Sequence, residues 1–219
     1  MSDGFTQMID TSRTFLGALA LNNDRDWFEA HKKAFKSEVE APLKLLTDLF
    51  AEDISLATGK SHTGKVGRIY RDVRFSKDKS PYNTHVHAYW MQANSARPGW
   101  LLHIDAGGAK IMTGLHALDA DGLMQYRKAV DRDGDALKEA IGVAADKGAR
   151  LVHFAETTLK RVPRPFDKDH PYGDLLRRKQ IVMEVVIDLA NPDIGFVAVF
   201  HERVADLLPF WTWCDNAFG

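Results

Sequence analysis

Apolar residues recur at helical spacing through the first quarter of the chain. Phe15 and Leu19 fall on one face of a helix predicted over residues 10–21. A second helical pattern covers residues 25–58, and Pro42 within it is expected to kink the segment or to begin a new helix, because proline lacks the amide donor. The sequence therefore predicts an N-terminal group of helices.

The middle of the chain changes to the alternating pattern that is typical of strands. The segments predicted as strands are residues 66–75, 83–91, 100–105 and 109–115, and Gly107-Gly108 forms a tight turn before the last of them. In residues 83–91 one face carries apolar side chains and the other carries histidines. This order predicts an antiparallel meander.

Helical and strand patterns mix again in the last half. The pattern predicts helices over 120–130, 134–145 and 172–179, strands near 151–154 and over 180–189, a proline-rich loop over 160–171, and a terminal helix from Pro192. No repeat or linker divides the chain. We therefore predict an α+β fold, a single domain over residues 1–219 with helices packed on a mostly antiparallel sheet.

Composition and charge narrow the class of protein. With 219 residues, 45% of them hydrophobic, and a net charge of −1, the chain reads as a globular protein and not as a general nucleic-acid coat protein. Cys214 is the one cysteine, so no intrachain disulfide or thiolate metal cluster is expected. No apolar run has membrane length, and a cytoplasmic protein without a membrane partner is expected.

Positive charge is concentrated in one stretch. Residues 65–82 carry six Lys and Arg side chains against two Asp side chains. If residues 66–75 are extended, Ile69, Val73 and Phe75 form a core face that also carries Arg71, while Asp72 on the other face orients neighbouring arginines. A buried guanidinium needs a partner or a ligand, so Arg71 marks a candidate anion site.

The same stretch resembles the signature of a family of uncharacterised proteins, domain of unknown function 2461. The signature is R-x-x-R-D-x-R-F-x-x-x-[DN]-K-x-x-Y, and its fixed positions are Arg68, Arg71, Asp72, Arg74, Phe75, Asp78, Lys79 and Tyr82. Other segments similar to the family include Asn22-Asn23, Trp27-Phe28 and residues 159–163. The resemblance extends nearly end to end, and it implies no established activity.

A second basic cluster lies far along the chain. Residues 160–180 carry seven Lys and Arg side chains against three Asp side chains. Two cationic patches on an otherwise anionic chain suggest that both face one anionic ligand, because arginine forks suit phosphate and carboxylate oxygens. The predicted anion-binding residues are Arg68, Arg71, Arg74, Lys79, Lys160 and Arg161, and the predicted supporting residues are Asp72, Asp78 and Tyr82.

Two functional hypotheses follow. The first is a pocket for a phosphate- or carboxylate-bearing small molecule, with or without catalysis. The alternative is a non-enzymatic structural or interaction protein, in which the basic motif is an internal ion-pair network. Nucleic acid is a candidate partner in this alternative, but it is not the favoured one. Neither hypothesis names a cofactor or an oligomeric state.

Histidines offer a third, weaker candidate. His85 and His87 share one strand face, and His103 and Asp105 share a face of a later strand. If the two strands pair in register, these four side chains could meet as ligands of zinc or iron. The other interpretation is a half-exposed sheet face that carries polar residues.

Overall fold

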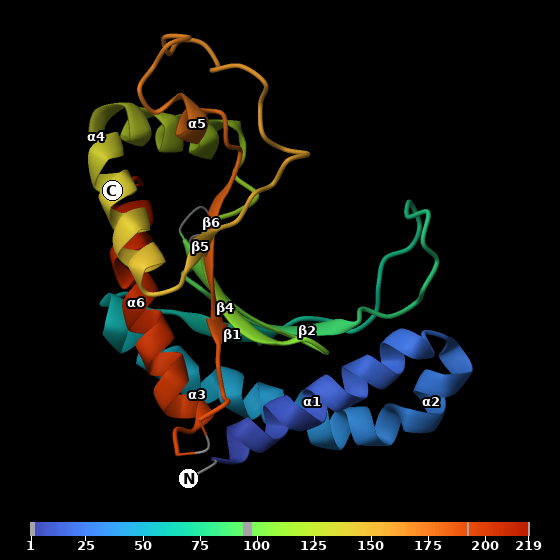
Figure 1. Ribbon diagram of the computed structural model, residues 1–219. Coiled ribbons are helices and arrows are strands. Elements are labelled where there is room, and N and C mark those ends of the chain that lie inside the picture. The colour runs from blue at the N-terminus through green and yellow to red at the C-terminus, as the bar shows by residue number, and fades with distance from the viewer. Residues whose placement is uncertain (1–2, 94–97, 192, 219) are drawn as a thin grey trace.

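The computed structural model describes residues 3–93, 98–191 and 193–218, and its fold is α+β as predicted (Figure 1). Within this part of the chain a six-stranded sheet has the order β1-β2-β3-β4-β6-β5, and each neighbouring pair is antiparallel. The strands are β1 (Thr63–Val66), β2 (His85–Met91), β3 (Gly99–Asp105), β4 (Gly108–Leu115), β5 (Arg150–Leu151) and β6 (Ile181–Ile187).

The helices enclose one face of this sheet and one of its ends. They are α1 (Gly4–Leu21), α2 (Arg25–Ala34), the π-helical η1 (Phe35–Glu40), α3 (Ala41–Thr58), α4 (Ala120–Asp146), α5 (Gly173–Leu176) and α6 (Phe196–Asn216). α1, α3 and α6 contact the sheet, while α4 packs on α6 and on α5. None of the described helices is long and apolar enough to cross a bilayer.

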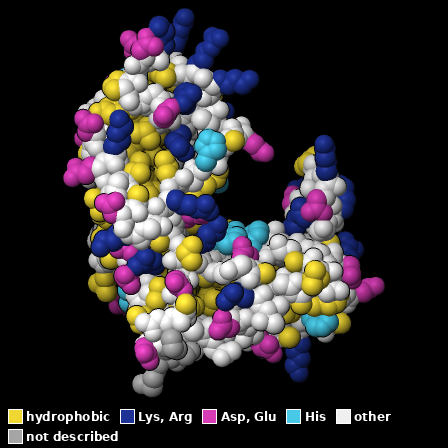
Figure 2. Space-filling view, in the orientation of Figure 1, with side chains coloured by type: hydrophobic (Ala, Val, Ile, Leu, Met, Phe, Trp, Pro, Cys, Tyr) yellow, Lys and Arg dark blue, Asp and Glu magenta, His cyan; other side chains and the backbone are white. Residues whose placement is uncertain are grey.

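Strand alternation separates a packed face from an open one. On β2, Val86, Ala88 and Trp90 are buried against the helices, and the Trp90 indole donates a hydrogen bond of 2.8 Å to the Thr47 carbonyl of α3. The side chains between them, beginning with His85, are half-buried on the other face. Figure 2 shows that this face is the floor of a wide hollow with histidines at its base.

Most predicted elements are confirmed with shifted ends. The first helix begins at Gly4 and not at residue 10, because the Asp3 side chain accepts a hydrogen bond from the Thr6 amide and caps it. α3 begins at Ala41, next to Pro42, as expected. The two helices predicted over 120–145 form one element with a kink at Asp133. Pro192, predicted to begin the last helix, lies outside the described residues, and α6 begins at Phe196.

The prediction of a strand over residues 66–75 is wrong. β1 ends at Val66, and residues 67–84 form an irregular excursion, the motif loop, in which one isolated bridge joins Tyr70 to Tyr82. Ile69 is buried as predicted, but Phe75 is 96% exposed instead of lying in the core. In Figure 1 this loop projects from the end of β2, and the space-filling view in Figure 2 shows it as one side of the hollow.

The close pairing of β4 with β6 yields a stability prediction. Gly114 has a φ of 139°, and a Cβ atom at this position would lie 2.1 Å from the carbonyl oxygen of Ile181. Gly114→Ala should therefore lower the free energy of unfolding by more than about 2 kcal/mol, measured by denaturant unfolding. The control is Gly142→Ala, because a Cβ atom on this α4 residue meets nothing within 4 Å.

The control variant should be unchanged or more stable by about 0.5–1 kcal/mol, the usual gain from alanine in a helix. Equal stabilities for the two variants would show that β4 and β6 are not as close at Gly114 as the structure has them.

Candidate anion-binding and histidine site

The motif loop is held in place by backbone pairing that continues the β1–β2 ladder. The Gly67 amide donates to the His87 carbonyl at 2.8 Å, the Asn83 amide donates to the Ile69 carbonyl at 2.7 Å, and the Arg71 amide donates to the Pro81 carbonyl at 2.9 Å. These bonds fix the two ends of the loop beside each other. The charged side chains of the loop are therefore held next to the edge of the sheet.

A side chain from the helical region clamps the returning half of the loop. The Asn23 amide group donates to the Tyr82 carbonyl at 2.9 Å and accepts a hydrogen bond from the Tyr82 amide at 3.1 Å. Tyr82 is 3% exposed, and its ring stacks on Phe28 of α2 with 4.0 Å between the ring centroids. Tyr82, predicted as a supporting residue, therefore anchors the loop to α2.

The charged side chains of the loop partly neutralise one another. Arg71 contacts Asp78 at 2.5 Å, and Arg74 contacts Asp72 at 2.6 Å. The Lys79 ammonium group donates to the Val73 carbonyl at 2.9 Å. These contacts leave Arg74 and Lys79 on the surface of the loop, paired within it.

Asp78 and Arg68 differ in their electrostatic environment. The pKa of Asp78 is held far below its usual range, first by hydrogen bonds from Ser80 and then by Arg71. Arg68 is exposed, and its side chain forms no hydrogen bond or ion pair within the described chain. Asp78 thus orients Arg71 as an ionised carboxylate, while the guanidinium of Arg68 is unpaired.

Arg71 lies at the wall of a groove between the motif loop and the start of α2. The groove has a volume of about 300 Å³, and its lining residues are Arg25, Glu29, Tyr70, Arg71, Val73, Pro81 and Tyr82. The Arg71 side chain is 25% exposed, so the prediction that it points inward is confirmed only in part. Its guanidinium has contacts with Asp78 and Ser76 and retains donors that neither of them uses.

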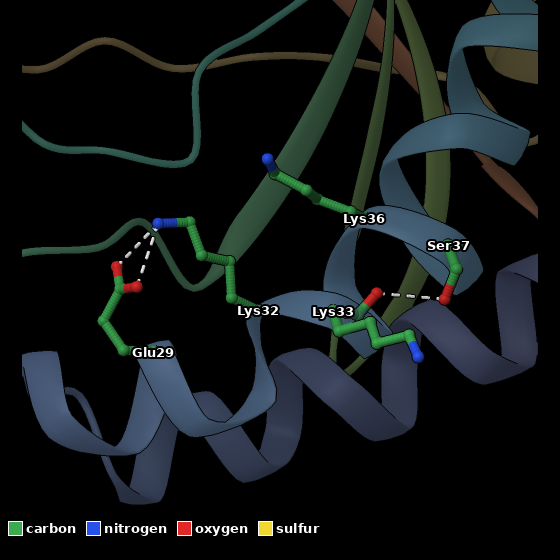
Figure 3. A pocket seen from close by; sticks show the side chains of 5 residues that line it. All are labelled: Glu29, Lys32, Lys33, Lys36 and Ser37. Carbon is green, nitrogen blue, oxygen red and sulfur yellow. Dashed lines mark hydrogen bonds and ion pairs between the residues drawn. The ribbon is translucent and has the colours of Figure 1, made fainter.

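A second, shallower pocket of about 540 Å³ adjoins the groove through Glu29 and follows α2 into η1. Its lining residues are Glu29, Lys32, Lys33, Lys36 and Ser37. Figure 3 shows Lys32 and Lys36 extending to the same side of the helix, where Lys32 contacts both carboxylate oxygens of Glu29 at 2.9 Å. Lys36 forms no hydrogen bond or ion pair among the residues that the structure describes.

Sequence reasoning missed this wall of the site. Successive steps of four, three and four residues separate Arg25, Glu29, Lys32 and Lys36, so these residues share one face of the helical pattern. The shared polar face of this helical pattern is the feature of the sequence that could have indicated these residues as part of the site. The residues predicted for the second wall, Lys160 and Arg161, line neither pocket.

Lys160 and Arg161 are exposed and belong to the long loop between β5 and α5. In Figure 1 this loop lies beside α5, on the opposite side of the hollow from the motif loop. The two basic segments therefore border one hollow from two sides, and they do not line one pocket.

The histidine prediction depended on strand register, and the register brings the four residues together. His85 pairs with Asp105, and His87 pairs with His103, across β2 and β3. His87 Nε2 lies 2.7 Å from His103 Nδ1, and His103 Nε2 lies 3.0 Å from Asp105 Oδ2. At the other end, His87 Nδ1 lies 2.9 Å from the Tyr89 hydroxyl. We call the hydrogen-bonded series of Tyr89, His87, His103 and Asp105 the histidine chain, and His85 lies outside it.

This arrangement differs from a metal site. In the histidine chain the ring nitrogens of His87 and His103 are directed at each other and at their neighbours. Among the described residues no three His, Cys, Asp or Glu side chains are placed to hold a metal ion. The geometry instead joins protonatable groups in a line, the arrangement that proton transfer requires.

Burial gives the histidine chain its electrostatic character. The pKa of His87 is lowered to about 3, mainly by burial and further by His85, His103 and Lys110. The pKa of Tyr89 is raised by burial. At neutral pH both groups are therefore uncharged, and each can serve as a neutral hydrogen-bonding partner.

Comparison with known proteins places the chain in a family. A family described as conserved hypothetical protein, DUF2461, matches residues 11–213, which is nearly the whole chain. The chain therefore belongs to this family, as its resemblance suggested. No curated protein matches it.

The half-buried His87 yields a prediction of pH dependence. His87 is neutral in the fold down to a pKa of about 3, whereas an unperturbed imidazole has a value of 6.5. Because the unfolded chain binds the proton first, the free energy of unfolding should fall as the pH falls from about 6.5 to about 3. In His87→Asn the loss should be smaller by up to about 1.4 kcal/mol per pH unit, and by less where solvent reaches the ring.

The matched control is His153→Asn, because His153 is exposed and without a hydrogen bond in the described part of the chain. Its pH profile should follow that of the natural protein. Identical profiles for all three proteins in denaturant titrations from pH 4 to pH 7 would contradict a half-buried His87 that stays neutral in the fold.

Proposed function

We propose that this protein binds a phosphate- or carboxylate-bearing small molecule in the groove between α2 and the motif loop, with Arg71 as the central contact. The observation that carries the proposal is the guanidinium of Arg71 at the groove wall, oriented by Asp78 and retaining donors for a ligand. A planar fork held in one orientation suits two oxygens of a phosphate or a carboxylate group.

The groove and its adjoining pocket favour an anion by their charge. Five lining residues are positively charged and Glu29 is the one carboxylate among them; the positive residues are Arg25, Lys32, Lys33, Lys36 and Arg71. Glu29 is already paired with Lys32. The net field therefore attracts anions, and this attraction is strongest in a recess where solvent screens the charges less.

Tyrosine hydroxyls add neutral donors to the same groove. Tyr70 and Tyr82 both line it, and burial raises the pKa of Tyr82 further above the neutral range. The Tyr82 hydroxyl therefore keeps its proton near pH 7 and can donate a hydrogen bond to an anionic oxygen.

The other residues of the predicted site have altered roles in this proposal. Arg68, Arg74 and Lys79 add positive potential on the loop without lining the groove. Lys160 and Arg161 lie outside the groove and have no contact with the ligand in this proposal.

The alternative, an interaction protein with nucleic acid as a partner, is favoured by a different observation. Phe75 is 96% exposed on the motif loop, and the Arg74 guanidinium lies 5.9 Å from its ring centroid. Exposed aromatic rings beside cations are typical of surfaces that stack nucleic-acid bases. A gel shift with single-stranded DNA at low salt that is lost in Phe75→Ala would support this alternative, and no shift would exclude it.

The proposal predicts a binding defect on removal of Arg71. Arg71→Ala should weaken the binding of inorganic phosphate by at least about tenfold, because a charge-assisted contact is worth about 1.5–3 kcal/mol. Arg71→Lys should recover part of the affinity, since it restores charge without the fork. Isothermal titration calorimetry at low ionic strength measures both effects.

The control is the double variant Lys160→Ala/Arg161→Ala, which removes two exposed cations outside the groove. Its phosphate affinity should stay within about threefold of the natural protein, a difference typical of screened surface charges. Equal losses in the control and in Arg71→Ala would point to a general charge effect and contradict a site centred on Arg71.

A further inference from the structure

Helix α3 carries leucines on its outer surface as well as in the core. Leu45, Leu49 and Leu56 are 56%, 53% and 75% exposed. Steps of four and seven residues separate them, so they lie in a line along one face of the helix, and we call them the leucine stripe. A single exposed leucine is ordinary on a protein surface, whereas leucines aligned at this spacing are typical of a face that another helix covers.

The leucine stripe borders an apolar groove between α3 and α6. The groove has a volume of about 270 Å³, and Leu56 of the stripe lines it together with Phe200 and Leu208 of α6. Its two polar lining residues are paired with each other, because Asp53 Oδ2 and His201 Nε2 lie 2.9 Å apart. The groove therefore offers apolar surface next to the stripe, with room for an apolar side chain of a partner.

This surface is separate from the site at the motif loop. Trp90 is on the buried face of β2, where it donates to the Thr47 carbonyl of α3, and the centroid of its ring lies 5.5 Å from that of Phe200 on α6. α3 and α6 therefore cover the face of the sheet opposite to the histidine chain. The groove between them shares no lining residue with the groove at Arg71, so binding at one surface does not require the other.

Unpaired negative charge lies beside the leucine stripe. Asp48 and Glu52 are exposed, and each is within one helical turn of two stripe leucines. Neither carboxylate has a hydrogen bond or an ion pair among the residues that the structure describes. The one cation of α3, Lys44, lies 3.4 Å from Glu40 and is thus directed to another acid. The stripe is therefore an apolar surface flanked by free carboxylates.

We propose that the leucine stripe and the adjoining groove dock a basic amphipathic helix of a partner protein. Apolar side chains of this helix would cover the three leucines, and one of them would enter the groove beside Leu56. Its Lys or Arg side chains would lie opposite Asp48 and Glu52. Complementary charges steer binding and like charges oppose it, so the two carboxylates select a basic partner.

Size and charge both disfavour a second copy of this chain as the occupant. From Leu45 to Leu56 the stripe is about 16 Å long, and over one helix width of about 10 Å it covers on the order of 200 Å². Stable complexes bury about 800 Å² on each partner, so the stripe has the size of a contact with one short helix. A twofold pairing of stripes would also bring the carboxylates of two copies together. The same carboxylates oppose an anionic membrane surface.

Fluorescence anisotropy with two labelled peptides tests the proposal. The lysine peptide is a synthetic amphipathic helix of leucine, alanine and lysine, and the glutamine peptide has glutamine in place of every lysine. The natural protein should bind the lysine peptide at least about tenfold more tightly than the glutamine peptide at low ionic strength, and added salt should reduce this difference.

Removal of the exposed leucines tests the apolar part of the surface. Leu49→Gln/Leu56→Gln should weaken binding of the lysine peptide at least about tenfold, because two apolar contacts are lost. The matched control is Leu21→Gln, since Leu21 is 86% exposed on α1 and lies outside the stripe. This control should bind the lysine peptide as the natural protein does.

Charge reversal tests the choice of a basic partner. Asp48→Lys/Glu52→Lys should abolish the preference for the lysine peptide over the glutamine peptide. The control is Glu139→Lys/Asp146→Lys, which changes the net charge by the same amount at two exposed positions of α4. It should keep the preference, whereas equal losses in both double variants would show a general charge effect and overturn the proposal.

The other outcomes are equally decisive. Absence of binding to the lysine peptide, or binding that Leu49→Gln/Leu56→Gln leaves unchanged, would overturn the proposal. Sedimentation velocity and flotation with anionic vesicles test the other occupants. A dimer or a vesicle complex that is lost in the same variant would assign the stripe to a second copy or to a membrane, and would overturn the proposal as well. The substituted side chains are all exposed, so each variant should keep the unfolding midpoint of the natural protein.

Discussion

The register of β2 on β3 is the constraint on which the candidate site depends. It sets His85 opposite Asp105 and His87 opposite His103, while the same alternation buries Trp90 against the helices. A slip of one residue would move the histidines into the core and the apolar side chains into the hollow. The packing of the core therefore also fixes the geometry of the open face. The side chains of the histidine chain are brought together by the strand register, without a further interaction that positions them.

The motif loop extends this constraint beyond the sheet. Its two ends continue the β1–β2 ladder, and the contacts of Asn23 and Phe28 with Tyr82 tie it to the helices. The result places a guanidinium, Arg71, between two different environments. On one side is the groove against α2, and on the other is Asp78 of the motif loop itself. A ligand at Arg71 would therefore be in contact with rigid elements and not with a free loop.

Sequence reasoning found much of this arrangement. Alternation revealed the strands and the shared face of His85 and His87, because the side-chain period of a strand is local. Register was out of reach, since it depends on pairing across the chain. The prediction of a strand over residues 66–75 was wrong, and Phe75 is exposed instead of buried. Alternating apolar residues also occur in a loop that is held by distant residues, as Asn23 holds this one. The local pattern does not distinguish the two cases. The sequence assigned the second wall of the anion site to Lys160 and Arg161 because positive charge is dense there. In the structure the residues beside the motif loop belong to α2, whose exposed face carries Lys32.

The central claim is that the motif loop and the start of α2 form one site for an anion. Crystals soaked in selenate, a dianion with an anomalous signal, test it most directly. The account predicts a selenate within hydrogen-bonding distance of the Arg71 guanidinium, in the groove lined by Arg25 and Tyr82. Selenate bound elsewhere on the surface, with the Arg71 donors occupied by the protein's own groups, would contradict it.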